Sequence, residues 1–487
     1  MRSLLGRFHR PMSRGLVNNM LTMNNLGDGS TLSLDFTTMG DVLDPRLTFS
    51  RAGGGTYVGS DGYIYGVDSA TSASLAIGTG SKSVTLTATA GVDRRFQVGQ
   101  TVYFSSGANN MSGLVTAYNA STQVITINAT ATTGSGSFTS WFVGNASPRF
   151  DYSPTNIGEP RGLLVEGSAI NLCTYSQAIS GAGWNAATGY TVTTNTTDLL
   201  SPAGDNTATK LVYTSGYARC IQTVNLAANT TYTMSYWIKS VGTHTFRVYD
   251  LTAGADIASS IGSIPVTSSW TRVQKTFTTG ASTSSCWFYV ANDGGPTAGM
   301  TAYVWGAQVE AGSGASSYIP TGASQVTRTS ESCTISGTNF SSWFTQGEGT
   351  LYAYSDVIKS NNRNLVARIE NAGATNYIEM GLNAVGYTTE AVAYAGGAFT
   401  SLGSAYTPVV NVPYKSAYTW SNGRLNLGAN GTTPTAVSAT LVTDLICIGI
   451  GGGFGMTDIY LRNGHIRQLK YYPMVMTNAQ LQALTTP

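Results

Sequence analysis

The sequence predicts an all-β protein built of several β-sandwich (jelly-roll) domains, with a small inserted β-barrel-like domain and little helix. Apolar and polar residues alternate in short runs, which Gly, Asn, Ser and Pro interrupt about every eight to twelve residues, a spacing typical of sandwiches and barrels. Glycine is abundant, at 57 residues, yet 42% of the chain is hydrophobic, more than a disordered chain carries. Helical periodicity is confined to the two ends of the chain.

Length and charge narrow the classes of function. A chain of 487 residues suggests about three domains. Lys and Arg number 26 and Asp and Glu 24, which leaves no strong field of either sign, so we expect no nucleic-acid partner. The sequence has no apolar run of about 18 residues, the length that spans a bilayer, so we expect no membrane insertion.

The cysteine and histidine patterns favour neither disulfides nor a metal centre. The cysteines are scattered singly and odd in number, so we expect buried free thiols. The histidines lie far apart in the sequence, and we expect no catalytic metal and no cofactor. A structural Ca²⁺ ion is kept as a weak alternative, because the loops near Asp293 and Asp458 offer oxygen ligands without a dense group of acids.

Two segments near the start of the chain flank residues 67–145, whose sequence pattern differs from theirs. Residues 31–66 and 146–170 are expected to form one N-terminal β region, because their patterns continue each other once the residues between them are removed. Those intervening residues, 67–145, contain four alternating strands joined by polar turns: SVTLTATAG, QVGQTVYFSS, SGLVTAYNA and QVITINATA. We therefore predict that 67–145 is an inserted small β domain.

Residues 171–329 predict a sandwich with three strands whose alternation separates a core face from an outer face. Tyr236, Phe246 and Phe288 belong to the core faces, and each strand also sends an aromatic side chain to its less apolar face. If the strands adjoin in one sheet, the outer residues form a platform on which sugar rings stack: Trp237, Tyr249 and Trp287, with Arg247 and Lys239 beside them. Alternatively, these aromatics pack against an adjoining domain or a second subunit.

Residues 330–487 contain longer alternating strands, which predict a second sandwich. Near its end, Thr477 and Gln480 form a capping-box pattern and Leu481 and Leu484 supply an apolar stripe, so we expect a short helix there. Trp305, in the preceding domain, is expected to be a core residue rather than a ligand contact.

No arrangement of residues indicates an enzyme. A GxSxG motif is absent, no glycine-rich loop precedes Lys-Ser or Lys-Thr, and the carboxylates are scattered rather than paired. Glu159, Glu166 and Glu310 are instead expected to pair at domain junctions with arginines, drawn from Arg46, Arg51, Arg161 and Arg328.

Four segments in a fixed order carry a family resemblance: LDFTTMGDVLDPRLTFSRAGGGTYVGSDGYI, PRFDYSPTNIGEPRGLLVEGSAINLCTYSQ, YVWGAQVEAGSGASSYIPTGASQVTRTSE and GHIRQLKYYPMVMTNAQLQAL. Through these segments the chain resembles bacteriophage and prophage virion proteins, namely tail fibres, head fibres or spikes. The resemblance covers the chain after its first thirty residues. The resemblance implies a carbohydrate-binding-module-like jelly roll at 171–329 and a concanavalin-like or laminin-G-like domain at 330–487. It marks no fixed binding residues.

The resemblance also implies a function and a place. We expect a structural virion fibre or spike, made in the host cytoplasm and carried on the surface of the phage particle, that binds host surface polysaccharide during adsorption. Exposed aromatics and low charge favour a homo-oligomer, and fibres of this kind are usually trimers. The alternatives are an architectural capsid decoration or tail collar without a glycan ligand, a depolymerase, and a secreted lectin or adhesin.

Residues 1–30 are predicted to attach the protein to other virion proteins. The segment is basic, has no acid before Asp28, and lacks the continuous apolar region and cleavage site of a signal peptide. A short peptide of this kind can order on binding and add apolar contacts and charge pairs. The residues expected to make these contacts are Arg2, Leu4, Leu5, Arg7, Phe8, Arg10 and Arg14. The alternative is a frayed terminus.

Overall fold

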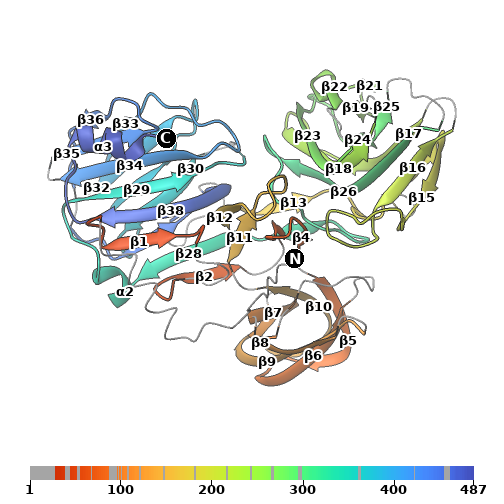
Figure 1. Ribbon diagram of the computed structural model, residues 1–487, viewed down its shortest axis with the longest axis horizontal. Coiled ribbons are helices and arrows are strands. Elements are labelled where there is room, and N and C mark those ends of the chain that lie inside the picture. The colour runs from red at the N-terminus through yellow and green to blue at the C-terminus, as the bar shows by residue number, and fades with distance from the viewer. Residues whose placement is uncertain are drawn as a thin grey trace, which may run out of the picture.

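The protein is described here from a computed structural model (Figure 1). The structure describes residues 28–487 apart from gaps at 39–43, 52–54, 67, 87–95, 97, 100, 107–108, 120–121, 146–147, 180–182, 215–217, 242–243, 265–267, 294–298, 360–362, 422, 442 and 454–460. The predicted attachment residues of the N-terminal segment lie outside these described residues.

Strands dominate the described chain, which confirms the predicted all-β class. The helices among the described residues are short: α2 (Thr338–Ser341), α3 (Asn478–Thr485) and the 3-10 turn η1 (Ala258–Ser260). The predicted capping box of α3 is confirmed, with Thr477 and Gln480 bonding each other's backbone amides. No helix in the described part of the chain is long and apolar enough to cross a membrane.

The predicted insertion contains a closed barrel, which lies apart from the two larger units (Figure 1). Its strands are β5 (Asp68–Ala76), β6 (Gly80–Leu86), β7 (Thr101–Ser106), β8 (Asn109–Asn119), β9 (Val124–Thr133) and β10 (Ser137–Asn145). The first and last strands pair, with Asp68 opposite Val143. The chain therefore leaves the barrel beside the point where it entered, which lets this unit interrupt the sequence without separating the segments on either side.

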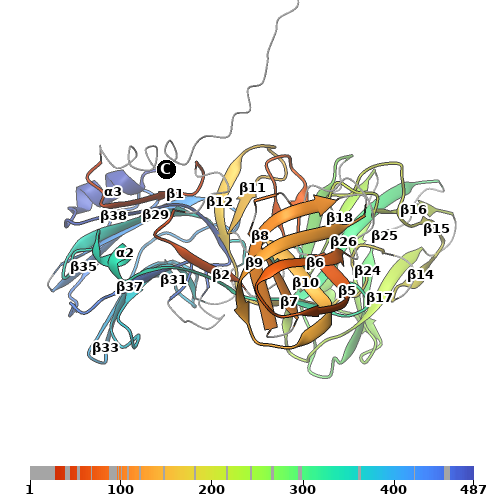
Figure 2. The same cartoon turned by 90° about the horizontal axis from the view of Figure 1, so that it is seen from below.

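The C-terminal sandwich has two sheets, seen as two layers at the left of Figure 2. The first sheet consists of β11 (Arg149–Tyr152), β12 (Pro160–Val165), β38 (Gly464–Tyr472), β29 (Gly349–Ser355), β34 (Tyr414–Ser421), β35 (Arg424–Ala429) and β36 (Thr435–Val437), with β1 (Leu32–Asp35) also paired to β38. The second consists of β2 (Thr48–Arg51), β28 (Glu331–Ser336), β37 (Cys447–Ile450), β30 (Asn364–Glu370), β31 (Tyr377–Leu382), β32 (Thr389–Ala395) and β33 (Ala398–Gly403).

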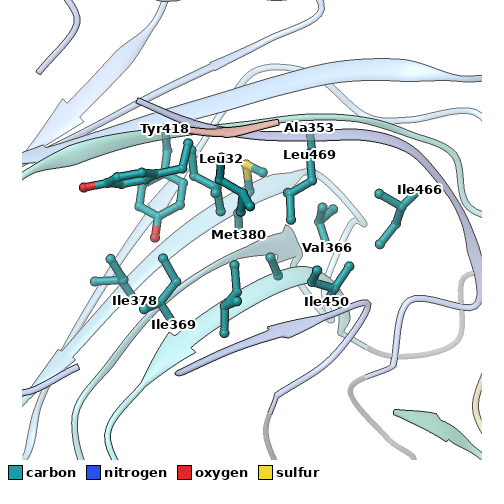
Figure 3. Packing of buried hydrophobic residues seen from close by; sticks show 14 of the residues in the cluster. Leu32, Ala353, Val366, Ile369, Ile378, Met380, Tyr418, Ile450, Ile466 and Leu469 are labelled. Carbon is teal, nitrogen blue, oxygen red and sulfur yellow. The ribbon is translucent and has the colours of Figure 1, made fainter. Parts of the chain in front are cut away.

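Strands from the two early segments are built into this sandwich. β1, β11 and β12 extend its first sheet, and β2 extends its second by pairing with β28. Apolar side chains from both sheets meet between the layers (Figure 3), among them Leu32 of β1 and Leu163 of β12. The sequence pattern had suggested a β region of their own for residues 31–66 and 146–170, because alternation identifies a strand but not its partner.

Residues 171–329 form the jelly roll, at the right of Figure 1. One sheet, called the β24 sheet, has the order β14 (Asn185–Thr188), β17 (Arg219–Asn225), β24 (Ser285–Val290), β20 (Val248–Asp250) and β21 (Ala255–Asp256). The other, called the β18 sheet, has the order β15 (Tyr190–Thr193), β16 (Thr209–Tyr213), β26 (Thr301–Ala311), β18 (Thr231–Ser240) and β23 (Thr271–Thr278). Shorter ladders complete the described strands: β3 (Tyr57–Val58) with β4 (Ile64–Tyr65), β13 (Ala169–Asn171) with β27 (Val326–Arg328), and β19 (His244–Phe246) between β22 (Gly262–Ile264) and β25 (Asn292–Asp293).

A buried ion cluster joins the jelly roll to the C-terminal sandwich; its members are Arg51, Arg149, Glu166, Arg328 and Glu331. Arg149 binds both oxygens of Glu331 at 2.6 Å and lies 2.8 Å from Glu166. Arg51 pairs with Glu331 at 2.8 Å and Arg328 with Glu166 at 3.1 Å. Burial disfavours the charged form of Glu166, but Arg328 and Arg149 outweigh it and lower the pKa of that carboxyl. Both carboxylates of the cluster, Glu166 and Glu331, have a lowered pKa and therefore remain ionised inside the protein.

The structure shows which partners Glu159, Glu166 and Glu310 have, each of which was expected to pair with an arginine at a domain junction. The predicted pairing of Glu166 with Arg328 is confirmed. Glu310 instead lies 3.2 Å from Lys359, and Glu159 accepts from the side chain of Asn156. The predicted arginine partners were wrong for these two residues, because ion pairs between distant segments depend on packing that the sequence pattern does not contain.

Candidate functional site

Two of the predicted platform residues lie side by side on the jelly roll. Tyr249 of β20 is directly opposite Trp287 of β24, and their rings are stacked with centroids 5.5 Å apart and planes 26° from parallel. Their neighbours Val248 and Phe288 belong to the core between the sheets. Because successive side chains in a strand alternate, Tyr249 and Trp287 face away from that core.

Charged groups frame the aromatic pair. The Nε atom of Arg247 donates to Oδ1 of Asp256 at 2.7 Å, and its guanidinium carbon lies 5.8 Å from the centroid of Tyr249 and 4.6 Å from that of Tyr289. The guanidinium carbon of Arg219 lies 5.5 Å from the centroid of Trp287. We call this surface the β24 face: Arg219, Arg247, Tyr249, Asp256 and Trp287, together with the buried Tyr289 next to Arg247.

The β24 face runs across its sheet rather than along one strand. Thr223 of β17 is opposite Trp287, which is opposite Tyr249, which is in turn opposite Asp256 of β21. Three spacings of about 4.8 Å between strands make this row about 14 Å long. Thr223 and Asp256 are exposed and the two rings are half-buried, so the row is accessible from solvent.

Trp237 and Lys239 do not join this face. They belong to β18, which pairs with β23 and β26 in the other sheet of the jelly roll. Trp237 is only 8% exposed and packs edge-on against Trp305 and Tyr318, at centroid distances of 5.3 and 5.5 Å. The predicted platform required the three strands to share a sheet, and only two of them do. For Trp237, the alternative of a packing role fits its position.

Arg219 and Asp256 were not among the residues predicted from the sequence. Tyr289 was placed on the same face as Trp287 by alternation, since the two residues are two positions apart. Arg219 comes near Trp287 only because β17 pairs with β24. Asp256 comes near Arg247 only because β21 pairs with β20. Neither pairing has a local signal in the sequence, so these residues could be found only from the folded structure.

The chemistry of the β24 face is that of a binding surface. Its carboxylate, Asp256, is held in an ion pair with Arg247. Burial raises the pKa of Tyr289, so this phenol stays protonated at neutral pH. Within the described residues, no group of three or more His, Cys, Asp or Glu side chains is placed to hold a metal ion. Asp458, on one of the loops considered for Ca²⁺, lies outside the described residues.

The five cysteines and Trp305 are buried, as the sequence predicted. All five cysteines are buried and free, which confirms the expected state of the thiols. Trp305 is fully buried, as expected for a residue without a ligand role. It packs on the outer side of the β18 sheet with Trp237, Tyr318 and Ala208, rather than between the two sheets.

Comparison with known proteins identifies this part of the chain. Residues 181–298 match the family described as a carbohydrate binding domain, and this segment includes every residue of the β24 face. No curated protein is significantly similar to the chain.

Solved structures that match parts of the chain include a sialidase module, an arabinanase domain and a laminin fragment. The sialidase CBM40 of Ruminococcus gnavus, bound to α2,3-sialyllactose, is 16% identical over 31% of this chain and 88% of its own, with a TM-score of 0.26. Domain 4 of an extracellular arabinanase from Geobacillus stearothermophilus is 9% identical over 36% and 82%, with a TM-score of 0.28. Domains LG4-5 of mouse laminin α1 are 10% identical over 51% and 83%, with a TM-score of 0.20. By its family match, the segment 181–298 is similar to carbohydrate-binding domains.

Proposed function

We propose that this protein binds glycans through the β24 face and catalyses no reaction on them. The observation that carries the proposal is the stacked pair Tyr249 and Trp287, flanked by Arg219 and Arg247, inside the segment that matches the carbohydrate-binding family. Aromatic surfaces bind the C–H faces of sugar rings, while a few fixed polar groups orient the hydroxyls.

The geometry of the face favours binding because its polar groups are already in place. Arg247 is fixed by its ion pair with Asp256 and by its position over Tyr289. A planar guanidinium held in this way loses little freedom when it donates to a sugar hydroxyl. The free carboxylate oxygen of Asp256 can accept from a hydroxyl at the end of the row.

Substitution of the two rings tests this proposal. Trp287→Ala and Tyr249→Ala should each weaken binding of purified protein to host surface polysaccharide by on the order of tenfold, a loss of about 1.4 kcal/mol. Binding is measured by isothermal titration, with oligosaccharides released from the same polysaccharide. Val241→Ala, which trims a 69% exposed apolar side chain of the same domain, is the matched control. Unchanged affinity in both ring variants would reject the β24 face as the site.

For the whole chain, the proposed role is that of a virion fibre or spike on the surface of a phage particle, assembled as a homotrimer. The four sequence segments that resemble phage fibre proteins support it. These segments supply the buried ion cluster: Arg51 from the first, Arg149 and Glu166 from the second, and Arg328 and Glu331 from the third. The segments that carry the resemblance are thus also the segments that supply the ion cluster at the domain junction.

Three measurements test the fibre role. Immunogold imaging of purified particles should place the protein on their surface, and ultracentrifugation should give the mass of a trimer. Deletion of residues 1–25 should leave the β domains folded but abolish incorporation into particles. Truncated protein present at normal copy number would reject the attachment role of this segment.

The competing role is an architectural one, as a capsid decoration or tail collar without a glycan ligand. Purified protein should block phage adsorption if it recognises the host surface. Particles labelled normally by antibody, combined with no inhibition of adsorption and no polysaccharide binding, would favour the architectural role.

A further inference from the structure

A second aromatic surface lies on the C-terminal sandwich, on the side of its second sheet that faces away from the core. Ile378 and Met380 of β31 and Ala391 and Ala393 of β32 point into the core. Their alternating neighbours therefore point outward. We call this surface the β31 face: Arg363, Tyr377, Glu390, Tyr394 and Phe399, together with the buried Glu379 that pairs with Arg363.

The aromatic residues of the β31 face form a row across three strands. Tyr377 is opposite Tyr394, which is opposite Phe399 of β33. The two tyrosine rings are stacked, with centroids 5.1 Å apart and planes 16° from parallel. Phe399 at the end of the row is 55% exposed. The row repeats, on another domain, the arrangement of Tyr249 and Trp287.

Guanidinium groups hold this row in place. The guanidinium carbon of Arg368 lies 3.5 Å from the centroid of Tyr377, and that of Arg363 lies 5.8 Å from the centroid of Phe399. Arg363 also bridges two strands, with Nη2 at 2.7 Å from Glu379 and 2.8 Å from Glu390. The rings and the charged groups therefore form one fixed surface rather than separate mobile side chains.

The charged groups of the β31 face indicate whether its ligand is neutral or anionic. Two arginines, Arg363 and Arg368, are paired with three glutamates, Glu370, Glu379 and Glu390. Both arginines are thus already paired with carboxylates. A ligand that donates hydrogen bonds to carboxylate oxygens is therefore favoured, and an anionic ligand, which ionised carboxylates repel, is disfavoured. At this end of the sheet the exposed Ser401 donates to Oε1 of Glu390, which is half-buried, at 2.5 Å.

We propose that the β31 face is a second saccharide-binding site, with uncharged oligosaccharides as its ligands. It goes beyond the proposed function, since it lies on a different domain from the β24 face and uses different residues. Hydroxyl groups of the sugar donate to Glu390 and its neighbours, and a C–H face packs on Phe399 and Tyr394. Two sites on one chain raise the apparent affinity for a polysaccharide long enough to reach both.

The test uses the full chain with the first site disabled by Tyr249→Ala and Trp287→Ala. The probes are an array of malto-, cello-, xylo- and galacto-oligosaccharides, with oligogalacturonates and sialyllactose as the acidic comparison. The double variant should still bind at least one neutral oligosaccharide. Addition of Phe399→Ala should lower that binding by on the order of tenfold. Val385→Ala, which trims an 84% exposed residue of the same sandwich, should leave it unchanged.

Each outcome decides a separate point. No neutral binding by the double variant, or neutral binding that Phe399→Ala leaves intact, would overturn the second site. Stronger binding of the acidic probes would overturn the assigned ligand class. Failure of the β24 face would appear instead as wild-type binding that does not change with Tyr249→Ala and Trp287→Ala. Phe399 is exposed, so its substitution tests the site without disturbing the core; Tyr394→Ala is a second probe of the same row.

Discussion

The buried ion cluster between the jelly roll and the C-terminal sandwich leads to a specific prediction about stability. Glu331 accepts from Arg149 through both carboxylate oxygens and also pairs with Arg51. The substitution Glu331→Gln preserves the size of this side chain but removes its charge. Three buried guanidiniums then face the single carboxylate of Glu166, and the net positive charge of the five-residue cluster rises from one to two.

We expect Glu331→Gln to lower the free energy of unfolding by about 3–5 kcal/mol, the usual cost of removing one partner of a buried ion pair. For a domain of this size the change corresponds to a fall in Tm of about 6–20 °C. Thermal unfolding followed by near-ultraviolet circular dichroism measures it. The matched control is Arg46→Ala, which breaks the partly exposed pair with Asp44 and should cost about 0–1 kcal/mol.

A second substitution, Arg51→Met, separates the effect of the lost charge in Glu331→Gln from any other effect of that substitution. Arg51→Met removes a cation that pairs with Glu331 at 2.8 Å. In the Glu331→Gln background it also removes the surplus positive charge, so it should cost less there than in the wild-type protein. The expected coupling is about 0.5–3 kcal/mol. Strict additivity, or a Glu331→Gln effect no larger than that of Arg46→Ala, would refute this electrostatic account of the junction.

Three further predictions concern single residues. His465 is buried between Asp151 and Asp356, at 2.8 Å from each, and although burial opposes its charge the aspartates raise its pKa to about 9. Its contribution to stability, about 3 kcal/mol, should be complete below pH 6.5 and disappear as the pH rises to 9; stability that changes with pH equally in wild type and His465→Gln would contradict this. Trp237→Ala should lower the free energy of unfolding by about 3–5 kcal/mol, seen in urea titrations, without changing the affinity per folded molecule; weaker binding at unchanged stability would instead restore Trp237 to the site. Thr477→Ala should cost about 1 kcal/mol by removing the cap of α3, with faster amide hydrogen exchange confined to that helix as the check.

The local alternation of apolar and polar residues was sufficient to predict the fold class and to predict which side chains of each strand face the core. A strand alternates with a period of two, so Phe246 and Phe288 were predicted to face the core and Tyr249 and Trp287 to face outward, and the structure confirms both. The cap of α3 was found for the same reason, since the groups that form it lie three residues apart.

The alternation of apolar and polar residues did not predict which distant strands pair with each other. The strand that carries Trp237 has the same alternation as the strands that carry Tyr249 and Trp287, yet it lies in the opposite sheet. The same limit applies to β1, β2, β11 and β12, which complete a sandwich formed by residues hundreds of positions later. It applies as well to Arg219, which reaches Trp287 only through the pairing of their strands.

The sequence by itself determined that this protein is made of strands, which side chains those strands bury, and that aromatic residues face outward from them. The tertiary structure decided which of these aromatics meet, which arginines and glutamates surround them, and which are covered. The physical reason is the range of the interactions involved. Backbone alternation and capping act over a few residues and leave a local record, whereas strand pairing, ion clusters and stacked rings depend on which distant surfaces come together when the whole chain is packed.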